Sequence, residues 1–359
     1  MRFRIVVLSI VLTILAAALP VLAAANTDAA LEYLKSQQNA DGGFGSGFSP
    51  DSAVGSTADA MLAILSVGGD LAAFDQGGNT PLTYLAANAA SVVTGGDLAK
   101  LIMAATAAGE NPRRLGGVDS VAKLEAMIGA DGKIGGATDT FVGHTLAVLA
   151  LASAGRPIPA AAVDTIKAAQ QDSGSWAWDG STETAGDTNT TAFAVQALIA
   201  AGEAADSDEI AAALAYYKEI HNDDGGWPYQ NPSEYGIATD ANSTAVVVQA
   251  LVAAGQDPAG AEWTSGEGNT PLVALEALQN ESGAFRWQDA VADDNLLATV
   301  QALPAVAGKA FPLTIMDVGE AAAPVTIPQT GGAVANLAWP LLLSGLALSG
   351  GGYALRRRK

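Results

Sequence analysis

Residues 39–45 read NADGGFG, and this stretch decides the fold because versions of it recur along the chain. It follows a short helical run, ALEYLKSQQ (residues 30–38), and its glycines do not favour continuing that helix. An Asp followed by Gly favours a turn, and the single Phe44 indicates that the turn is fixed against something apolar. We therefore expect a corner between two helices at this point.

Apolar, Ala-rich runs end at a glycine six times, at intervals of 41 to 53 residues. Such a glycine is the expected C-terminal stop of a helix, and a regular interval indicates a repeat architecture. Between the stops lie further helix candidates, each followed by a Gly-containing turn: NADGGFG, TGG, ADGKIGG, DSGSWAW, DDGGWPY and ESGAFRW. The stops are Gly68, Gly109, Gly155, Gly202, Gly255 and Gly308, and the further helix candidates are residues 30–38, 80–90, 121–129, 162–171, 209–221 and 270–280.

Two kinds of helix alternate in this pattern. The helices before the turns carry Lys, Glu and Tyr beside an apolar stripe, which predicts half-exposed helices, whereas those before the stops are apolar nearly all round, which predicts burial. Closing six such hairpins into a circle leaves no end of the buried layer exposed. The sequence therefore predicts an all-α protein, an α6/α6 toroid of six helical hairpins over residues 27–310, with the turn aromatics filling the seams between neighbouring units.

The two ends of the chain differ from this body. Residues 1–25 have a basic start, an apolar run and a small-residue end, which predict a secretory signal peptide; an uncleaved membrane anchor is the alternative. Residues 311–326 are expected to be a linker. Beyond them, IPQTGG precedes an apolar stretch about as long as a membrane-spanning helix and then RRRK, which would stay in the cytoplasm. We therefore expect the body of the protein outside the cell.

Residues 327–359 resemble the cell-wall sorting signal of bacterial surface proteins, whose usual form begins with Leu rather than Ile. The resemblance implies that a sortase cuts between Thr330 and Gly331 and joins the protein to the cell wall. It also implies that a C-terminal helix holds the protein in the membrane before processing. A plain membrane anchor at the C-terminus is the alternative.

Charge and cysteine content exclude several partners. Six of the 17 basic residues lie in the two ends, so the body has 37 acidic residues against 11 basic ones. Nucleic acid and anionic lipid are poor partners for such a surface. Because the chain has no Cys, it has neither disulfides nor thiolate metal ligands.

One turn carries a motif of a known family. QQDSGSW (Gln170 to Trp176) has the Gln-x-x-Gly-x-Trp spacing of the Gln-Trp motif in squalene and hopene cyclases, and QNADGGF and QNESGAF are looser copies. Across residues 27–308 the chain resembles the prenyltransferase and squalene-cyclase repeat superfamily, which implies an α/α toroid. It also resembles the cobalamin carriers of the intrinsic factor type, which share that barrel, although strands for a second carrier domain are not apparent.

The activities that this resemblance implies each lack an essential group here. There is no Asp-x-Asp-Asp motif; the nearest stretches are DSDE (residues 206–209) and the pair Asp293 and Asp294. DDNLL (residues 293–297) lacks the last Asp of an Asp-Asp-x-x-Asp motif, and the zinc and thioester sites of the family need Cys. We therefore expect no known catalytic set, and whether the protein is an enzyme stays open.

Three related loops precede predicted inner helices: DTNTTAFAVQAL (residues 187–198), DANSTAVVVQAL (240–251) and DDNLLATVQAL (293–303). Their polar residues suit helix N-caps, which is the structural interpretation. In the functional interpretation these helix starts converge on one mouth of the toroid and bind a sugar, another polar ligand or Ca²⁺, or supply a carboxylate pair for glycoside hydrolysis. The candidate residues are Asp187, Asn189, Asp240, Asn242, Asp293 and Asn295.

The turn aromatics and one histidine are further candidates. The aromatics either fill seams or form a rim on which a sugar or apolar ring stacks, since Trp and Tyr suit half-wet sites. His144, at the start of a buried helix, is either a hydrogen-bonded core residue or a general base or ligand. The aromatic candidates are Trp176, Trp178, Trp227, Tyr229 and Trp287.

These observations lead to three hypotheses. The first is a non-catalytic surface module that binds a small molecule, a corrinoid or a glycan in the toroid mouth, with Ca²⁺ as its one possible cofactor. The second is an enzyme, either a divergent terpenoid cyclase or a carbohydrate-active hydrolase. The third is a structural or adhesive module, for which a plugged centre is expected.

Overall fold

The computed structural model describes residues 25–136, 138–234 and 236–320. Residues 1–24 of the predicted signal peptide and the whole predicted sorting signal, with Thr330 and Gly331, lie outside these residues. Among the helices that the structure describes, none combines the length and the apolar character that a bilayer crossing needs.

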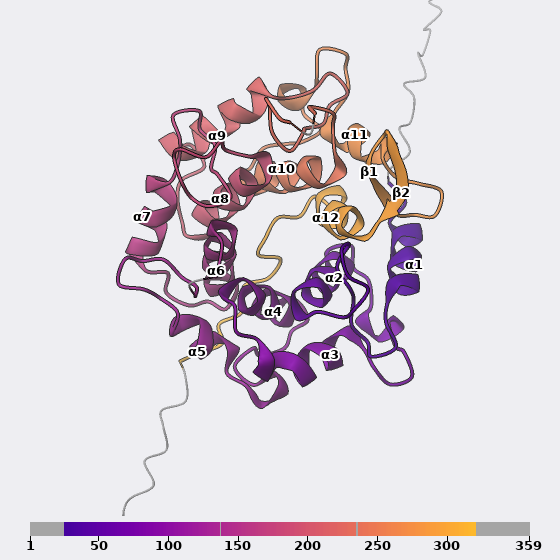
Figure 1. The fold of residues 1–359 in the computed structure, drawn as a ribbon, viewed down its shortest axis with the longest axis vertical. Coiled ribbons are helices and arrows are strands. Elements are labelled where there is room, and N and C mark those ends of the chain that lie inside the picture. Colours follow the sequence, from indigo (N-terminus) through magenta and orange to yellow (C-terminus); the bar gives the residue numbers. More distant parts are fainter. Residues whose placement is uncertain (1–24, 137, 235, 321–359) are drawn as a thin grey trace, which may run out of the picture. The chain divides into compact units, whose positions relative to one another are not determined.

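The described residues contain twelve α-helices, arranged as an inner and an outer set (Figure 1). The inner helices are α2 (Val54–Ser66), α4 (Gly95–Ala107), α6 (Phe141–Ser153), α8 (Thr188–Ala200), α10 (Ala241–Ala253) and α12 (Leu296–Val306). The outer helices are α1 (Thr27–Gln37), α3 (Pro81–Asn88), α5 (Ser120–Glu125), α7 (Ala160–Ala168), α9 (Asp208–Glu219) and α11 (Pro271–Ala277).

The inner helices close into a ring. Each packs against the next along the chain, and α12 packs against α2, which completes the circle (Figure 1). The first outer helix, α1, lies against α12, so the two ends of the repeat array meet. Next to this seam, Gln279 donates from Nε2 to the Asn26 carbonyl at 3.0 Å. The predicted toroidal, mostly helical architecture is confirmed.

Burial follows the alternation that the sequence predicts. In α6, 12 of the 13 residues are buried, whereas in α1 only 3 of 11 are. The predicted glycine stops are also confirmed, because all six have positive φ, between 61° and 96°, immediately after an inner helix. An inner helix therefore packs apolar surface on both sides and then turns back toward the surface of the molecule.

The prediction of an all-α protein is wrong in one place. Strand β1 (Phe285–Gln288) pairs antiparallel with β2 (Val291–Asn295), where the sequence predicted a turn and a polar loop. In this last repeat the segment between the Gly-aromatic turn and the inner helix pairs with the turn itself, with Phe285 opposite Asn295 and Arg286 opposite Asp294. The TGG stretch of the second repeat also differs, because Thr94 caps α4 there, with Oγ1 accepting from Asp97 N at 3.2 Å.

The Gly-aromatic turns bind the inner helices in a repeated way. The backbone N–H of the first aromatic donates to a threonine four residues after the helix cap, as in Trp176 to Thr191 Oγ1 at 3.0 Å. The motif glutamine is Gln170 rather than Gln171, one place earlier than the spacing suggested. Gln170 Nε2 donates to Gly174 O and to Glu209 O, at 2.9 Å and 2.8 Å, and so connects the turn to the next outer helix.

Residues 311–320, the first part of the expected linker, pack against one end of the toroid. Met316 N donates to Ser153 O at 2.8 Å, and Phe311 N donates to Gln196 Oε1 at 2.9 Å. Arg113 Nε donates to Gly319 O at 3.0 Å. Figure 1 shows this segment, in gold, running from α12 across the ring towards α5. The segment therefore covers the end of the ring opposite the inner-helix starts described below.

Candidate functional site

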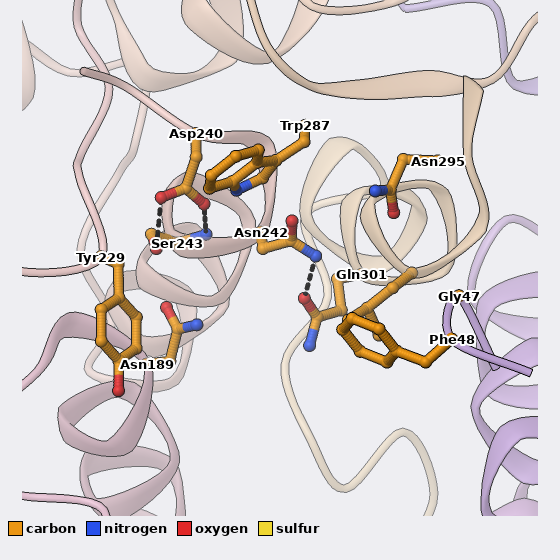
Figure 2. A pocket seen from close by; sticks show the side chains of 11 residues that line it. Gly47, Phe48, Asn189, Tyr229, Asp240, Asn242, Ser243, Trp287, Asn295 and Gln301 are labelled. Carbon is orange, nitrogen blue, oxygen red and sulfur yellow. Dashed lines mark hydrogen bonds between the residues drawn. The ribbon is translucent and has the colours of Figure 1, made fainter. Parts of the chain in front are cut away.

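A cavity of about 440 Å³ opens where three inner helices, α8, α10 and α12, begin (Figure 2). The amide side chains on its wall come from these helix starts and from the body of α12. Its aromatic side chains come from the loops and the strand that precede inner helices. The lining residues are Gly47, Phe48, Asn189, Tyr229, Asp240, Asn242, Ser243, Trp287, Asn295, Leu297 and Gln301.

The amide side chains are placed by the helix starts. Asn189 and Asn242 each lie two residues after the cap of their helix, on the side that faces the ring interior. Asn242 Nδ2 donates to Gln301 Oε1 at 2.7 Å, a bond drawn in Figure 2, and this links α10 to α12 across the cavity wall. Asn189 Oδ1 has no hydrogen-bond partner in the described part of the chain.

The two predicted aspartates of α8 and α10 act as helix caps. Asp187 Oδ1 accepts from Thr190 N and Asp240 Oδ1 from Ser243 N, both at 2.7 Å. Both carboxyl groups are almost fully buried. Asp240 lines the cavity and Asp187 does not. The structural interpretation of these aspartates is therefore correct, and Asp240 also forms part of the cavity wall.

Burial changes the titration of Asp240. The surrounding protein disfavours its charged form more than the Ser243 hydrogen bonds favour it, and this raises its pKa from 3.8 to about 6. Burial raises the pKa of Asp187 as well. The one carboxyl group of the cavity wall, that of Asp240, is therefore mostly uncharged only below about pH 6.

We expect Asp240→Asn to remove a pH dependence of stability. The folded chain binds the Asp240 proton more tightly than the unfolded chain, so the stabilising contribution is complete below pH 4 and is lost as the pH rises through 6. Asn caps helices about as well as Asp. Urea unfolding should find the variant more stable than the wild type by about 3 kcal/mol at pH 7.5, with little difference at pH 4. An equal difference in the free energy of unfolding at both pH values would contradict the raised pKa of Asp240.

The third loop is aligned differently from the prediction. Asn295 is the cap of α12, with Oδ1 accepting from Ala298 N at 2.9 Å, so it occupies the place of Asp187 and Asp240. Asp293 lies on β2, is exposed and does not line the cavity. Leu297 occupies the place of Asn189 and Asn242. In the last repeat the Asp-x-Asn pattern therefore does not mark the structural positions that it marks in the two preceding repeats.

His144 is a core residue. Its Nδ1 accepts from Ile134 N at 3.0 Å, which leaves Nε2 to carry the proton and donate to Ala162 O at 3.0 Å. The side chain is fully buried, and burial lowers its pKa. It stands four residues after the cap Thr140, where Thr191 stands in its own repeat. His144 is therefore a neutral structural residue, not a general base or ligand of the cavity.

The aromatic candidates divide into two groups. Trp176 and Trp227 are fully buried and fill seams, as the structural interpretation predicted. Tyr229 and Trp287, two residues after the first aromatic of their turns, are more than a third exposed and line the cavity. Trp178 has the same place in its turn and is 53 % exposed, but it does not line the cavity.

Sequence reasoning missed several cavity residues. Phe48 is 94 % exposed and comes from the loop before α2. Gln301 lies on α12, in a stretch whose mostly apolar sequence predicted only a buried helix. Asp59 and Lys100 form an ion pair deeper in the ring, with Nζ and Oδ2 2.6 Å apart. A signal for this pair existed, because each is the single charged residue within an otherwise apolar stretch of an inner helix.

The electrostatics of the cavity restrict its ligands. Its 11 lining residues include no Lys, Arg or His and one carboxyl group, that of Asp240. Within residues 25–136, 138–234 and 236–320, no group of three or more His, Asp or Glu side chains is placed to hold a metal ion. The cavity as built suits an uncharged ligand.

Comparison with known proteins agrees with the fold. Residues 122–294 match the squalene-hopene cyclase C-terminal domain, and residues 1–90 match the prenyltransferase alpha-alpha toroid domain. No curated protein sequence matches the chain. Solved structures with similar folds at low sequence identity include the following three.

One is the type II terpene cyclase MstE from Scytonema, with a TM-score of 0.56 and 15% identity, covering 78% of this chain and 96% of that one. A protein from Actinoplanes has a TM-score of 0.55 and 16% identity, with 79% and 98% covered. Unsaturated glucuronyl hydrolase from Bacillus sp. GL1 has a TM-score of 0.50 and 14% identity, with 70% and 84% covered. The closed ring of inner helices, the Gln-Trp turn and the two family matches make the chain similar to the prenyltransferase and squalene-cyclase-like α-α toroid superfamily.

Proposed function

We propose that the toroid is a non-catalytic binding domain that holds an uncharged, hydroxyl-rich molecule, such as the end of a glycan, in its mouth cavity. The observation that carries this proposal is the composition of the cavity wall. Four amide side chains, those of Asn189, Asn242, Asn295 and Gln301, lie among three aromatic ones, those of Phe48, Tyr229 and Trp287.

This composition matches the chemistry of a sugar. An amide side chain offers both donors and acceptors, so it can pair with hydroxyl groups in either role. Aromatic rings that are partly exposed offer flat apolar faces against which the C–H side of a sugar ring packs. Asn189 Oδ1, which has no partner in the described chain, provides an acceptor for a ligand hydroxyl.

The same wall disfavours two other ligand classes. A diphosphate needs cationic side chains or a metal ion, and no basic residue lines the mouth. Glycoside hydrolysis requires two carboxyl groups flanking the bond that breaks, whereas the lining includes only Asp240, which caps its own helix. The open cavity also differs from the plugged centre expected of a purely structural module.

We also propose that this binding takes place outside the cell, on a protein that is exported and attached to the cell wall. Support comes from the sequences of residues 1–25 and 327–359, and the net negative charge of the body suits a soluble exported domain. Mass spectrometry of the native protein would test it, with a C-terminus at Thr330 expected after sortase cleavage. An intact C-terminus at Lys359 would contradict the sortase step.

Cyclisation of a terpenoid is the second candidate function, and the fold neighbours include a type II terpene cyclase. The observation that favours it is Asp59, a carboxyl group in the ring interior whose pKa burial raises. Its contact with Lys100 Nζ, at 2.6 Å, stabilises the ionised carboxylate and so opposes a role as proton donor. We therefore favour binding over catalysis.

The binding proposal predicts a contrast between two tryptophans. Trp287→Ala removes a ring from the cavity wall and should weaken binding of a glycan by at least about tenfold, with a smaller loss of stability than truncation of a fully buried Trp because the side chain is 36 % exposed. Trp178→Ala is the matched control, since Trp178 has the same place in its turn and is exposed away from the cavity. Glycan-array screening of the purified protein, followed by calorimetric titration of the binders, provides the measurement.

Equal loss of affinity in both variants, or no binding to any glycan on the array, would overturn the proposal. A product formed from a bound ligand would shift the conclusion to the enzymatic alternative.

A further inference from the structure

Six structurally equivalent side chains form a ring inside the toroid, deeper than the mouth cavity. Each lies six residues after the N-cap of its inner helix, and all six line one interior cavity of about 210 Å³. In order around the ring they are Asp59, Lys100, Leu146, Phe193, Val246 and Gln301.

This interior ring has a polar half and an apolar half. Gln301, Asp59 and Lys100 come from α12, α2 and α4, which are neighbours in the closed circle. The opposite half is formed by α6, α8 and α10, which contribute Leu146, Phe193 and Val246, and further apolar residues of the wall extend the apolar surface. The polar half forms only because the ring closes, since α12 and α2 are far apart in the sequence but pack against each other.

The polar half holds hydrogen-bond donors that the described chain leaves unused. An ammonium group has three donors, and Lys100 Nζ contacts one acceptor, Asp59 Oδ2. Its side chain remains 28 % accessible, on the side of the cavity. Gln301 Oε1 accepts from Asn242, while in residues 25–136, 138–234 and 236–320 Gln301 Nε2 has no partner.

A buried acceptor completes the site. Gln249 is 1 % exposed and lines the same cavity. Its Nε2 donates to the Gln301 carbonyl at 2.9 Å, which fixes the orientation of the amide and leaves Oε1 without a partner in the described residues. A buried polar atom without a partner costs free energy, so a ligand that supplies a donor regains it.

We propose that the interior ring is a subsite for an uncharged apolar molecule that carries an oxygen function on one edge. The carbonyl or hydroxyl oxygen accepts hydrogen bonds from Lys100 and Gln301, and a hydroxyl also donates to Gln249. The hydrocarbon body packs against Leu146, Phe193 and Val246. The Asp59 carboxylate neutralises Lys100, so the subsite selects an oxygen atom rather than a full negative charge.

This subsite is distinct from the proposed glycan site, although both cavities share Leu297 and Gln301 on their walls. The shared residues place the subsite directly beneath the mouth. A ligand that occupies only the interior needs none of the mouth aromatics, and this separates the two proposals experimentally.

Two molecules with the same carbon skeleton test the subsite. Tetralin is a hydrocarbon, and 1-tetralone adds one carbonyl oxygen at a ring edge. Calorimetric titration of the purified protein should show the ketone binding about tenfold more tightly than the hydrocarbon, since the carbonyl gains hydrogen bonds, one of them from a charged donor. Equal affinities, or no binding of either compound, would overturn the proposal without any variant being needed.

Variants identify the residues responsible for the preference for the ketone. Asp59→Leu combined with Lys100→Met replaces the ion pair by apolar side chains without leaving a buried charge, and should abolish the preference for the ketone. Phe193→Ala should weaken both compounds by the same factor. Lys35→Met, which changes an exposed lysine on outer helix α1, is the control and should change neither affinity. A ketone preference that survives in the double variant would contradict the roles of Asp59 and Lys100.

Trp287→Ala distinguishes this subsite from the mouth. The tetralone preference should persist in that variant, even where glycan binding is lost. A protein that binds no glycan but prefers the ketone would refute only the proposed function, and the reverse result would refute only the interior subsite.

Discussion

Replacing Trp227 with alanine is expected to destabilise the protein by about 4 kcal/mol, which is typical of removing a fully buried Trp. The side chain is fully buried between the fifth and sixth repeats. Its ring stacks on His221, with centroids 4.4 Å apart, and lies 6.1 Å from the Trp263 ring. Its Nε1 donates to Tyr217 O at 2.8 Å, so the truncation also removes the donor from a helix carbonyl.

Urea unfolding followed by far-ultraviolet circular dichroism measures this loss. Trp287→Ala is the matched control, because it removes the same group from a partly exposed position and should lower the free energy of unfolding by no more than about 2 kcal/mol. Similar losses in the two variants would show that Trp227 does not hold the seam together.

Replacing Gly283 with alanine is expected to destabilise the protein by about 3 kcal/mol, through left-handed backbone strain together with overpacking. Gly283 has φ of +88°, and a Cβ atom there would lie 2.2 Å from the Ala29 carbonyl carbon. Ala29 belongs to α1, so this contact joins the last turn to the first helix. A backbone atom cannot move aside as a side chain can, and the seam that closes the ring must therefore open.

Gly255→Ala separates the two causes. Gly255 also has positive φ, +70°, but a Cβ atom there would have no neighbour within 4 Å. The Gly255→Ala variant should lose about 1–2 kcal/mol of unfolding free energy, the strain of a left-handed residue alone. Parallel unfolding curves for both variants provide the comparison, and equal losses would contradict the close packing of α1 against the last turn.

Much of this fold could be predicted from local patterns. A helix that packs apolar surface on two sides must be apolar nearly all round, and one that packs on one side keeps a polar stripe. Glycine after an inner helix, at Gly155 or Gly255, adopts a conformation that other residues rarely do. These are properties of single residues and their near neighbours. The β1–β2 hairpin was missed because β2, VADDN, lacks the alternation of apolar and polar residues that indicates a strand.

The candidate site was predicted only in part. Asn189 and Asn242 were found because the two loops are near copies, and both do line the mouth. The sequence pattern aligned Asp293 with Asp187 and Asp240 and so predicted it at the mouth. In the structure, the helix start in that repeat is capped by Asn295 instead. The threonine that receives the turn N–H, Thr191 in one repeat and Thr299 in another, would have corrected the alignment. Its role becomes visible only once the hydrogen bond is seen.

The sequence by itself determined the repeat, the two kinds of helix and the glycines that end them, because each depends on local backbone preference and on which side chains avoid water. Only the tertiary structure decided which polar groups meet. Asp59 and Lys100 are 41 residues apart, and Gln301 joins them only because α12 packs against α2. Closing the ring brings together residues from the two ends of the repeat array, and no local sequence pattern determines which of these residues meet.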